Sequence, residues 1–319
     1  MIYVDFNGRC GDQFFQYAFS RKIQLRMNDQ SPLQFNFFNQ ERWRKKLNDE
    51  SFRNDLQFFN VVDNNSFVSE KKCFDSFSSK KQKKLFEKYI FIKKIVFRTK
   101  LKLLAKHYQK KLQKNGIYYD DEYFELYSYP KKNVDVFIRG YFENYKYLYN
   151  DDELRKALLI ELTPKDNTLA SDDLLFNYIL NNECVCVSMR SWGEIAGDKK
   201  TFNSRMVCDE NYYKKAFDLI INTCPNVTFI IFSDNIDWAK KTIGNSFKAL
   251  YESGKNTICE KITLMKNCKH FIIANSSFSW WTQYLSDNKN KIVVSPNRWY
   301  TDSDDKRVIN PSWTIIKTF

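Results

Sequence analysis

The sequence predicts an α/β protein with two domains, each built around a parallel sheet. In the second half of the chain, apolar segments of strand length alternate with amphipathic helical segments, which is typical of a parallel sheet covered by helices on both faces. The chain has 319 residues, and at roughly 100–200 residues per domain this length fits two domains. We expect a first domain over residues 1–165 and a second over residues 166–319.

The first half opens with a strand, a glycine turn and a helix. Residues 2–6 are apolar and predict a short strand, Gly8 and Gly11 predict a turn, and a helix with a broad apolar face follows over residues 14–25. Backbone N–H groups in such a turn can approach a phosphate, although the residues match neither the dinucleotide nor the P-loop fingerprint. A further strand that runs into an aromatic turn is expected within residues 134–149.

The second half has a regular pattern of strands and helices. The predicted strands are residues 184–189, 227–234, 270–274 and 291–296. The predicted helices are residues 209–221, a segment that begins near Asn235, residues 261–268 and residues 276–285. Ligands of such folds bind beyond the carboxyl ends of the strands, so the polar residues that follow the strands form the candidate site.

The positive charge of the chain is concentrated in residues 71–114. This stretch has 16 Lys and Arg against two acidic residues, Asp75 and Glu87, so its net charge of +14 exceeds the +13 of the whole chain. Apolar residues recur there mostly at three- and four-residue steps, which predicts a basic amphipathic helix. These residues are Leu85, Tyr89, Ile92, Val96, Leu101, Leu104, Tyr108 and Leu112. Contact with an anionic membrane and packing on the protein's own core both explain the pattern, and both interpretations stay open.

Histidine and cysteine usage argues against a metal site and against disulfides. The chain has two histidines, His107 and His270, and its eight cysteines include no C-x-x-C pair. Cys184 and Cys186 would lie on one face of a strand as small buried side chains. We therefore expect no metal and a reducing compartment. No signal peptide or membrane-spanning segment is recognisable, so a cytoplasmic protein is expected.

Four polar clusters follow predicted strands and together predict a ligand-binding cleft. They are residues 8–13, 188–194, 233–235 and 275–277. Because the carboxyl ends of parallel strands meet at one edge of their sheet, clusters of the same domain should lie close together.

Arg190 is the first candidate for a phosphate ligand. It directly follows a buried strand, and an arginine fork in a cleft suits a diphosphate. The alternative is a surface ion pair with Glu194 or Asp198. Asp234 ends the next strand, where its carboxylate would accept hydrogen bonds from a base or ribose, or else would cap a turn or helix.

A helix N-terminus is the second candidate. Asn275, Ser276 and Ser277 would open a helix, so their side chains and free backbone N–H groups can receive a phosphate at the positive end of the helix dipole. Plain capping of that helix is the alternative interpretation.

Six sequence blocks carry a specific resemblance. They are NGRCGDQFFQYAFSRKIQ, RGYFENYKYL, CDENYYKKAF, FIIFSDNIDWAK, LMKNCKHFIIANSSFSWWTQYL and KIVVSPNRW. In this order they resemble the bacterial alpha-1,2-fucosyltransferase family, and the IIANSSFSWW block is the most specific of them. The blocks span Asn7 to Trp299, while residues 64–125 match no family signature.

The resemblance implies a GT-B architecture, in which two Rossmann-like domains with parallel sheets face each other across a cleft. It implies a GDP-sugar held mainly by the C-terminal half, no required metal, and inversion at the anomeric carbon of the sugar by direct displacement. The expected donor-binding residues are Gly8, Gly11, Gln13, Arg190, Asp234, Asn275, Ser276, Ser277 and Phe278.

The chain departs from that family at two places. Where the family carries H-x-R-R-x-D, this sequence has SMRSWGE, so Arg190 keeps the first arginine while Ser188 replaces the histidine and Ser191 the second arginine. Glu194 reaches the position of the aspartate only with a one-residue shift. Asp12 stands where the family carries asparagine. Together these changes lower the positive charge near the expected diphosphate by about two units, which admits a donor other than GDP-fucose.

We expect an inverting glycosyltransferase that moves L-fucose from GDP-fucose to a hydroxyl of a bacterial surface glycan or its precursor. Arg190 would stabilise the departing diphosphate, and Glu194 would take the proton of the acceptor hydroxyl, with Asp12 as its rival. The same fold with another nucleotide-sugar donor and a catalytically inactive family member are the alternatives.

A basic nucleic-acid-binding protein belongs to another functional class and is disfavoured. Such a protein would disperse basic residues among stacking aromatics, whereas the charge here is confined to one segment and the predicted strand-end site lies elsewhere. An oligosaccharide or lipid-linked glycan is the expected acceptor. A lipid-linked acceptor would bring the enzyme to the inner face of the cell membrane, where the basic segment would contact anionic lipid.

Overall fold

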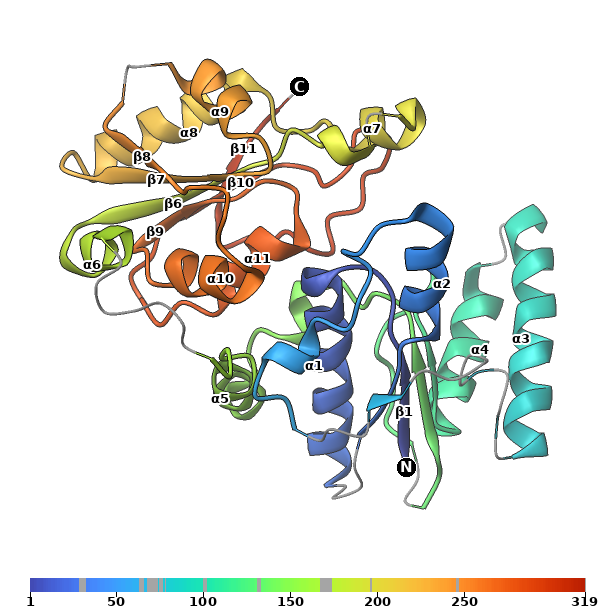
Figure 1. The fold of residues 1–319 in the computed structure, drawn as a ribbon. Helices are drawn as coiled ribbons and strands as arrows, with labels where there is room; N and C mark the ends of the chain where they lie inside the picture. The colour runs from blue at the N-terminus through green and yellow to red at the C-terminus, as the bar shows by residue number, and fades with distance from the viewer. Residues whose placement is uncertain are drawn as a thin grey trace. The chain divides into compact units, whose positions relative to one another are not determined.

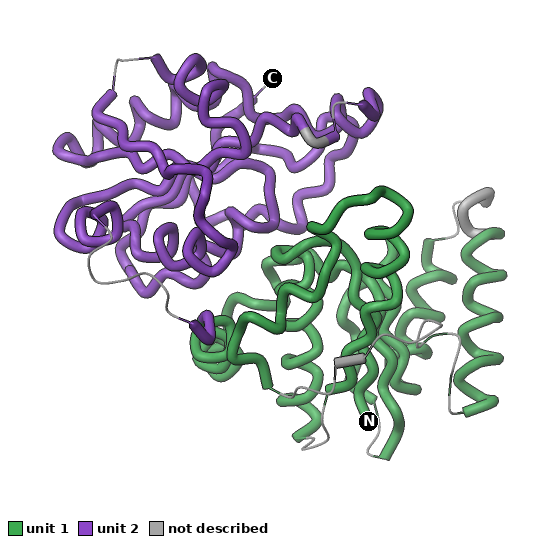
Figure 2. The backbone as a smooth tube through the Cα atoms, in the orientation of Figure 1, with its two compact units in different colours: residues 1–163 green, residues 164–319 purple. Residues whose placement is uncertain are grey.

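The computed structural model describes residues 1–28, 33–62, 66–67, 74, 77, 79–99, 102–130, 133–166, 174–195, 197–244 and 247–318. Within these residues the chain forms two compact units, Met1–Thr163 and Pro164–Phe319 (Figure 2). The division falls two residues before the boundary expected at residue 165.

The first unit is a parallel sheet between two layers of helices. Its strands are β1 (Ile2–Asp5), β2 (Leu33–Asn36), β3 (Ser66–Phe67), β4 (Ile117–Tyr119) and β5 (Val136–Arg139), in the spatial order β3-β2-β1-β5-β4. Each neighbouring pair is parallel. Its helices are α1 (Cys10–Met27), α2 (Phe38–Leu47), α3 (Lys80–Thr99), α4 (Lys102–Lys114) and α5 (Asp152–Glu161), with short 3-10 helices η1 (Leu56–Phe58) and η3 (Tyr145–Tyr147). Helix α1 lies on one side of β1, and α3 and α4 lie on the other (Figure 1).

The second unit repeats this architecture with six strands. They are β6 (Cys184–Met189), β7 (Thr228–Ser233), β8 (Ala249–Tyr251), β9 (His270–Ile272), β10 (Val293–Pro296) and β11 (Thr314–Ile316), in the order β11-β10-β9-β6-β7-β8. The helices are α6 (Leu174–Asn181), η4 (Gly193–Ile195), α7 (Lys199–Arg205), α8 (Glu210–Thr223), α9 (Ile236–Ile243), α10 (Ile258–Lys266) and α11 (Ser277–Tyr284). Helices α8 and α9 cover one face of the sheet, and α10 and α11 cover the other (Figure 1). The prediction of two Rossmann-like units with parallel sheets is confirmed.

The central strand β6 shows why the strands of the second half could be predicted from the sequence. Its six residues are all buried, because helices cover both faces of the sheet, so the strand is a continuous apolar run. Helix α8 packs on this sheet through one apolar face, and its start is fixed by Asp209, whose carboxylate accepts the N–H of Tyr212 at 2.8 Å. Each fully buried large apolar side chain of this core contributes about 1.5–3 kcal/mol.

The basic segment forms two helices, α3 and α4, rather than the single predicted amphipathic helix. Of the apolar residues that predicted it, Leu85, Tyr89, Ile92 and Leu112 are buried in the core of the first unit. For these four residues the self-packing interpretation is confirmed. Parts of residues 71–114 lie outside the described residues. No helix in the described ranges combines the length and the apolarity that crossing a bilayer requires.

Candidate functional site

The strand order of the second unit creates a switch point between β6 and β9. From β6 the chain proceeds to β7 and β8 on one side, and from β9 to β10 and β11 on the other. Strands β6 and β9 are paired in parallel, so the segments that follow them leave the sheet at the same edge. Ligands of open parallel sheets bind at such a point, because the two departing connections open a crevice there. The segment with Arg190 follows β6, and the segment from Asn275 to Ser277 follows β9.

Arg190 is held at this edge by a ring and a carboxylate. Its side chain is 24% exposed, and its guanidinium carbon lies 4.7 Å from the centre of the Trp192 ring. Its Nε is 3.7 Å from Oδ2 of Asp234. Asp234 is therefore an ion-pair partner of Arg190 that the sequence analysis did not name. The alternative pair with Glu194 involves a side chain outside the described part of the structure.

The loop after β6 is shaped by Asp234. Its carboxylate accepts the backbone N–H groups of Ser191 at 2.8 Å and of Trp192 at 3.1 Å. Trp192 has a left-handed backbone with φ 56°, a conformation that a bulky residue adopts only when its surroundings hold it there. A contact of Asp234 with a base or ribose stays a prediction.

Trp192, Arg205 and Tyr300, which the sequence analysis did not name as candidates, lie together with Arg190. The guanidinium carbon of Arg205, the last residue of α7, lies 5.5 Å from the centre of the Trp192 ring and 4.5 Å from that of Tyr300. Trp192 therefore has two guanidinium groups on it, those of Arg190 and Arg205. Stacking of this kind leaves no spacing signal in a sequence, because its members come from three separate segments.

Asn275 joins the segment after β9 to the end of α7 and to the segment after β10 through hydrogen bonds. It is fully buried, and its Nδ2 donates to the carbonyl oxygens of Arg205 and of Trp299, both at 2.9 Å. Its Oδ1 is buried and has no hydrogen-bond partner within the described residues. The next residue, Ser276, is the N-cap of α11, yet its side chain makes no capping hydrogen bond in the described structure. The capping interpretation of Ser276 is thereby not supported. As in any α-helix, the first N–H groups of α11 have no partner inside the helix.

Ser277 and Phe278 form the first turn of α11 and are half-buried.

Two buried tyrosines bind the carboxyl ends of strands β9 and β6. Tyr212 donates to the carbonyl oxygen of Ile273 at 2.6 Å, and Tyr213 donates to that of Ser188 at 3.2 Å. Burial raises the pKa of both phenols well above the ordinary value, so they stay neutral donors.

The predicted residues of the first unit have partners within that unit. Gly8 has φ 73°, and Oδ2 of Asp12 accepts the N–H of Arg9 at 3.0 Å, which caps α1. The side chain of Gln13 is buried and donates to the carbonyl oxygen of Gly8 at 3.2 Å. The prediction that Gly11 belongs to the turn is wrong, because Gly11 is the second residue of α1, where the helix has already begun.

Gln13 also joins the loop after β1 to a more distant segment. Its Nε2 donates to the carbonyl oxygen of Arg53 at 2.7 Å, and its Oε1 accepts the N–H of Asp55 at 3.0 Å. These bonds use both ends of its amide. The binding roles of Gly8, Asp12 and Gln13 toward a donor stay predictions. Glu194 lies in η4, and its side chain is outside the described part of the structure.

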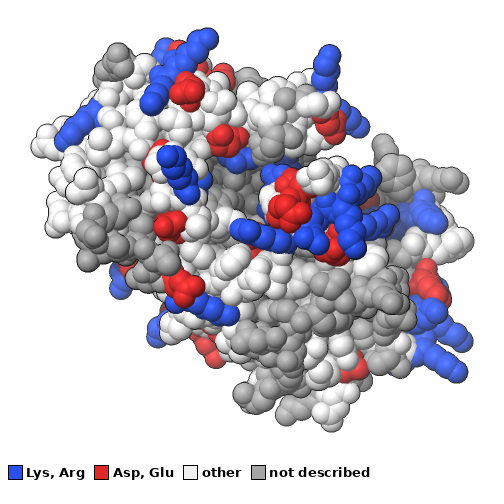
Figure 3. Space-filling view, in the orientation of Figure 1, with Lys and Arg blue, Asp and Glu red and all other residues white. Residues whose placement is uncertain are grey.

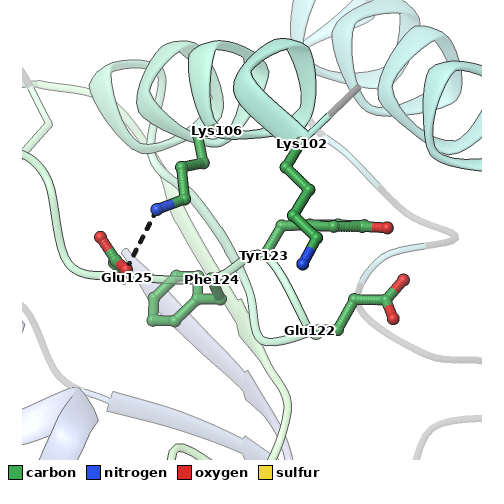
Figure 4. A pocket seen from close by; sticks show the side chains of 6 residues that line it. All are labelled: Lys102, Lys106, Glu122, Tyr123, Phe124 and Glu125. Atoms are coloured by element: carbon green, nitrogen blue, oxygen red, sulfur yellow. Dashed lines mark hydrogen bonds and ion pairs between the residues drawn. The ribbon is translucent and has the colours of Figure 1, made fainter. Parts of the chain in front are cut away.

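Neither of two surface pockets involves the residues predicted from sequence. One, of about 310 Å³, lies beside α4 and is lined by Lys102, Lys106, Glu122, Tyr123, Phe124 and Glu125 (Figure 4). The other, of about 300 Å³, is formed by residues 266–269 and 285–288, which precede β9 and follow α11. Among the described residues, no three or more His, Cys, Asp or Glu side chains gather as a metal site would require.

Comparison with known proteins finds a matching family model, two similar bacterial enzymes and a similar solved structure. A family model described as Glycosyl transferase family 11 matches residues 1–317. The O-antigen biosynthesis glycosyltransferase WbnK of Escherichia coli is 26% identical over 322 residues, covering 98% of this chain and 99% of the relative. An alpha-1,2-colitosyltransferase of Escherichia coli is 26% identical over 297 residues, covering 92% and 90%. A solved fucosyltransferase, NodZ from Bradyrhizobium, is similar with a TM-score of 0.47 and 12% identity, covering 89% and 91%.

Proposed function

Because the chain belongs to glycosyl transferase family 11, we propose that it is an inverting enzyme that transfers L-fucose from GDP-fucose. The acceptor would be a hydroxyl of a bacterial surface glycan or its precursor, and the product an α-1,2 linkage. The observation that carries the proposal is the convergence of Arg190 and the N-terminus of α11 at the switch point of the second sheet. A positive side chain and a helix N-terminus at one edge of a sheet suit a nucleoside diphosphate.

The chemistry needs two contributions from this chain. Negative charge grows on the diphosphate as the bond to the sugar breaks, and Arg190 would neutralise it in a preorganised site. A carboxylate would take the proton from the attacking acceptor hydroxyl, so that attack from the opposite side inverts the anomeric carbon. Glu194 is the proposed base.

The identity of the donor sugar has a second candidate. The chain has Ser191 in place of a second arginine, and one of its relatives is named for colitosyl transfer. A GDP-linked sugar other than L-fucose is therefore the alternative within the same activity. We propose that no metal is needed, because arginine side chains supply the positive charge that a divalent cation would otherwise bring.

A nucleotide-sugar screen tests the proposal. Thermal unfolding is measured with GDP-fucose, other GDP-sugars, UDP-sugars and free GDP. A ligand at a hundred times its dissociation constant should stabilise the native state by about 2.7 kcal/mol. The stabilising donor is then incubated with glycan acceptors in the presence and absence of EDTA, and the linkage of the product is read by NMR. Stabilisation by UDP-sugars alone would refute the GDP-sugar assignment.

We also propose that the enzyme attaches peripherally to anionic lipid at the inner face of the membrane, through α3 and α4. These helices carry 13 Lys and Arg and one Glu. Two of the lysines, Lys93 and Lys106, form ion pairs with described carboxylates, at 3.3 and 3.4 Å. Figure 3 shows basic side chains along the edge of the molecule that α3 forms.

Exposed apolar side chains accompany this charge. Phe91 on α3 is 64% exposed and Leu103 on α4 is 84% exposed, and Ile95 and Leu104 are 40% and 39% exposed. The nearby pocket holds two lysines and two glutamates, and Lys106 is paired with Glu125 (Figure 4). Its balanced charge disfavours a discrete anion site, so we assign the attraction to the helix surface. Each Lys or Arg near an anionic leaflet contributes about 1 kcal/mol.

Co-sedimentation with vesicles tests the attachment. The protein should pellet with anionic vesicles at low salt, pellet less as the Debye length falls below about 8 Å, and stay in solution with neutral vesicles. Phe91→Ser should weaken pelleting, whereas Ile160→Ser, at a 71% exposed apolar residue on α5, should not. No pelleting at low salt would leave α3 and α4 as helices that only cover their own core.

A further inference from the structure

We propose that Arg205 is the second cation of the donor diphosphate site, held for that purpose between the rings of Trp192 and Tyr300. This inference rests on the proposed function, since it assigns a ligand-binding residue to the same crevice. It assigns to the phosphates a residue 15 positions beyond Arg190 in sequence.

Hydrogen bonds fix the end of α7 at the carboxyl edge of the sheet. The carbonyl oxygen of Arg205 accepts from Nδ2 of Asn275, the residue before the N-cap of α11. The preceding turn is bound to the segment after β10, because Thr301 donates its N–H to the carbonyl oxygen of Ser204 and its hydroxyl to that of Asn203, both at 2.9 Å. Arg205 therefore occupies a built position beside the start of α11.

The side chain of Arg205 is oriented by aromatic rings. Its guanidinium carbon lies 4.5 Å from the centre of the Tyr300 ring and 5.5 Å from that of Trp192. Rings at these distances attract a cation through their faces and limit its rotamers. Among the described residues, no carboxylate lies within ion-pair distance of Arg205. No described carboxylate therefore neutralises the charge of its guanidinium group.

The guanidinium carbons of Arg190 and Arg205 both lie within 5.5 Å of the centre of the Trp192 ring, so an anion beside this ring would be attracted by both charges. Arg190 lies 4.7 Å from Trp192 and has Asp234 at 3.7 Å, which offsets part of its charge. A diphosphate carries enough charge and enough oxygen acceptors to bind both forks at once. Ser191, next to Arg190, offers no charge for this purpose. The shared contact with Trp192 therefore supports the proposal that Arg205 binds the same diphosphate as Arg190.

Calorimetric titration with GDP, GMP and inorganic pyrophosphate tests the assignment. Arg205→Gln should weaken GDP and pyrophosphate binding roughly 10- to 100-fold, the scale of one or two charge-assisted hydrogen bonds. GMP should lose less, and the salt dependence of GDP binding should become shallower. Arg205→Lys should recover part of the affinity, because it keeps the charge but not the fork. Arg307→Gln, at an arginine that pairs with Asp305, is the matched control and should bind as the parent does.

A double-mutant cycle with Trp192→Leu adds a second measurement. If the ring orients Arg205, the two substitutions should be non-additive in GDP binding. Equal losses for GDP and GMP in Arg205→Gln, or GDP binding like the parent, would overturn the assignment and leave Arg205 as a structural residue. If the parent protein binds pyrophosphate but not GDP, the proposed donor is contradicted. The loss of pyrophosphate affinity in Arg205→Gln then decides whether Arg205 binds phosphate. Parent protein that binds neither would overturn both.

Discussion

The carboxylate of Asp234 accepts the backbone N–H groups of both Ser191 and Trp192, at 2.8 and 3.1 Å. Asp234 follows β7 and thereby fixes the loop after the neighbouring strand β6, which carries Arg190 and Trp192. These hydrogen bonds give Asp234 a positioning role, and a contact of its carboxylate with a base or ribose stays a prediction.

We expect Asp234→Ala to release this loop. GDP affinity should fall about tenfold or more, and the free energy of unfolding by about 1.5–3 kcal/mol, the usual value of hydrogen bonds to a charged group. Titration with pyrophosphate separates the two roles of Asp234. Loss of affinity for both ligands supports positioning of the loop, whereas loss for GDP alone would mean that Asp234 contacts the nucleoside as the sequence predicted.

Gly8 is a position where any side chain should be costly. Its φ is 73°, and a Cβ there would lie 2.1 Å from Oδ2 of Asp12, the atom that accepts the N–H of Arg9 at 3.0 Å. Gly254 has a similar φ of 78° and no described atom within 4 Å of such a Cβ. Gly254→Ala should therefore cost about 1–2 kcal/mol of unfolding free energy from backbone strain alone.

Gly8→Ala should cost more than Gly254→Ala, because the carboxylate must also move and the helix cap of α1 is lost. Chemical denaturation of the two variants measures the difference. Equal losses would mean that Asp12 moves without cost and that its cap contributes little.

The fold was predictable where burial was complete. The strands β6 and β7 are nearly continuous buried runs, and their apolar sequence identified them directly. By contrast, β8 is three residues long and at most half-buried, so no periodic signal marked it. The apolar pattern of the basic segment predicted helix but could not tell which partner the apolar face would meet, since a core and a membrane impose the same periodicity.

The candidate site was predictable only where it follows strands. Arg190 and Ser276 were named as candidates because ligands bind at the carboxyl ends of parallel strands, and their binding roles stay predictions. Arg205 was missed because it ends a seven-residue polar helix with no buried residue, and only the tertiary fold brings it to Trp192 and Tyr300.

Asp151 should make the first unit sensitive to acid. Burial raises the pKa of its carboxyl, but hydrogen bonds from Lys22 at 2.9 Å and from Arg26 lower it by more, so the pKa lies below the ordinary value. A depressed pKa contributes stability that is present above the unfolded value near 4 and is lost as the pH falls through the folded value.

Asp151→Asn should flatten this part of the pH profile. The amide keeps an oxygen that can accept the N–H of Leu154 and so retains the cap of α5. Unfolding free energy is measured from pH 6 to about pH 2, with Asp218→Asn, at an exposed residue of α8, as the control. An unchanged slope below pH 4 in Asp151→Asn would show that other carboxylates govern acid unfolding.

The catalytic base is the prediction most directly tied to turnover. We expect Glu194→Gln to lower kcat by about 10²–10⁴ and to leave GDP affinity unchanged, because a general base acts on the acceptor hydroxyl and not on the diphosphate. The acidic limb of the pH profile of kcat should also disappear in this variant, since that limb reports protonation of the base.

Asp12 is the rival base, and its geometry allows a clean comparison. Its carboxylate caps α1 by accepting the N–H of Arg9, and an asparagine can make the same bond, so Asp12→Asn should fold like the parent. Near-parent turnover in Asp12→Asn together with a crippled Glu194→Gln supports Glu194 as the base. The reverse result would move the role to Asp12. If both variants turn over like the parent, neither carboxylate is the base and the proton must leave by another group, because direct displacement by a neutral hydroxyl still has to release it.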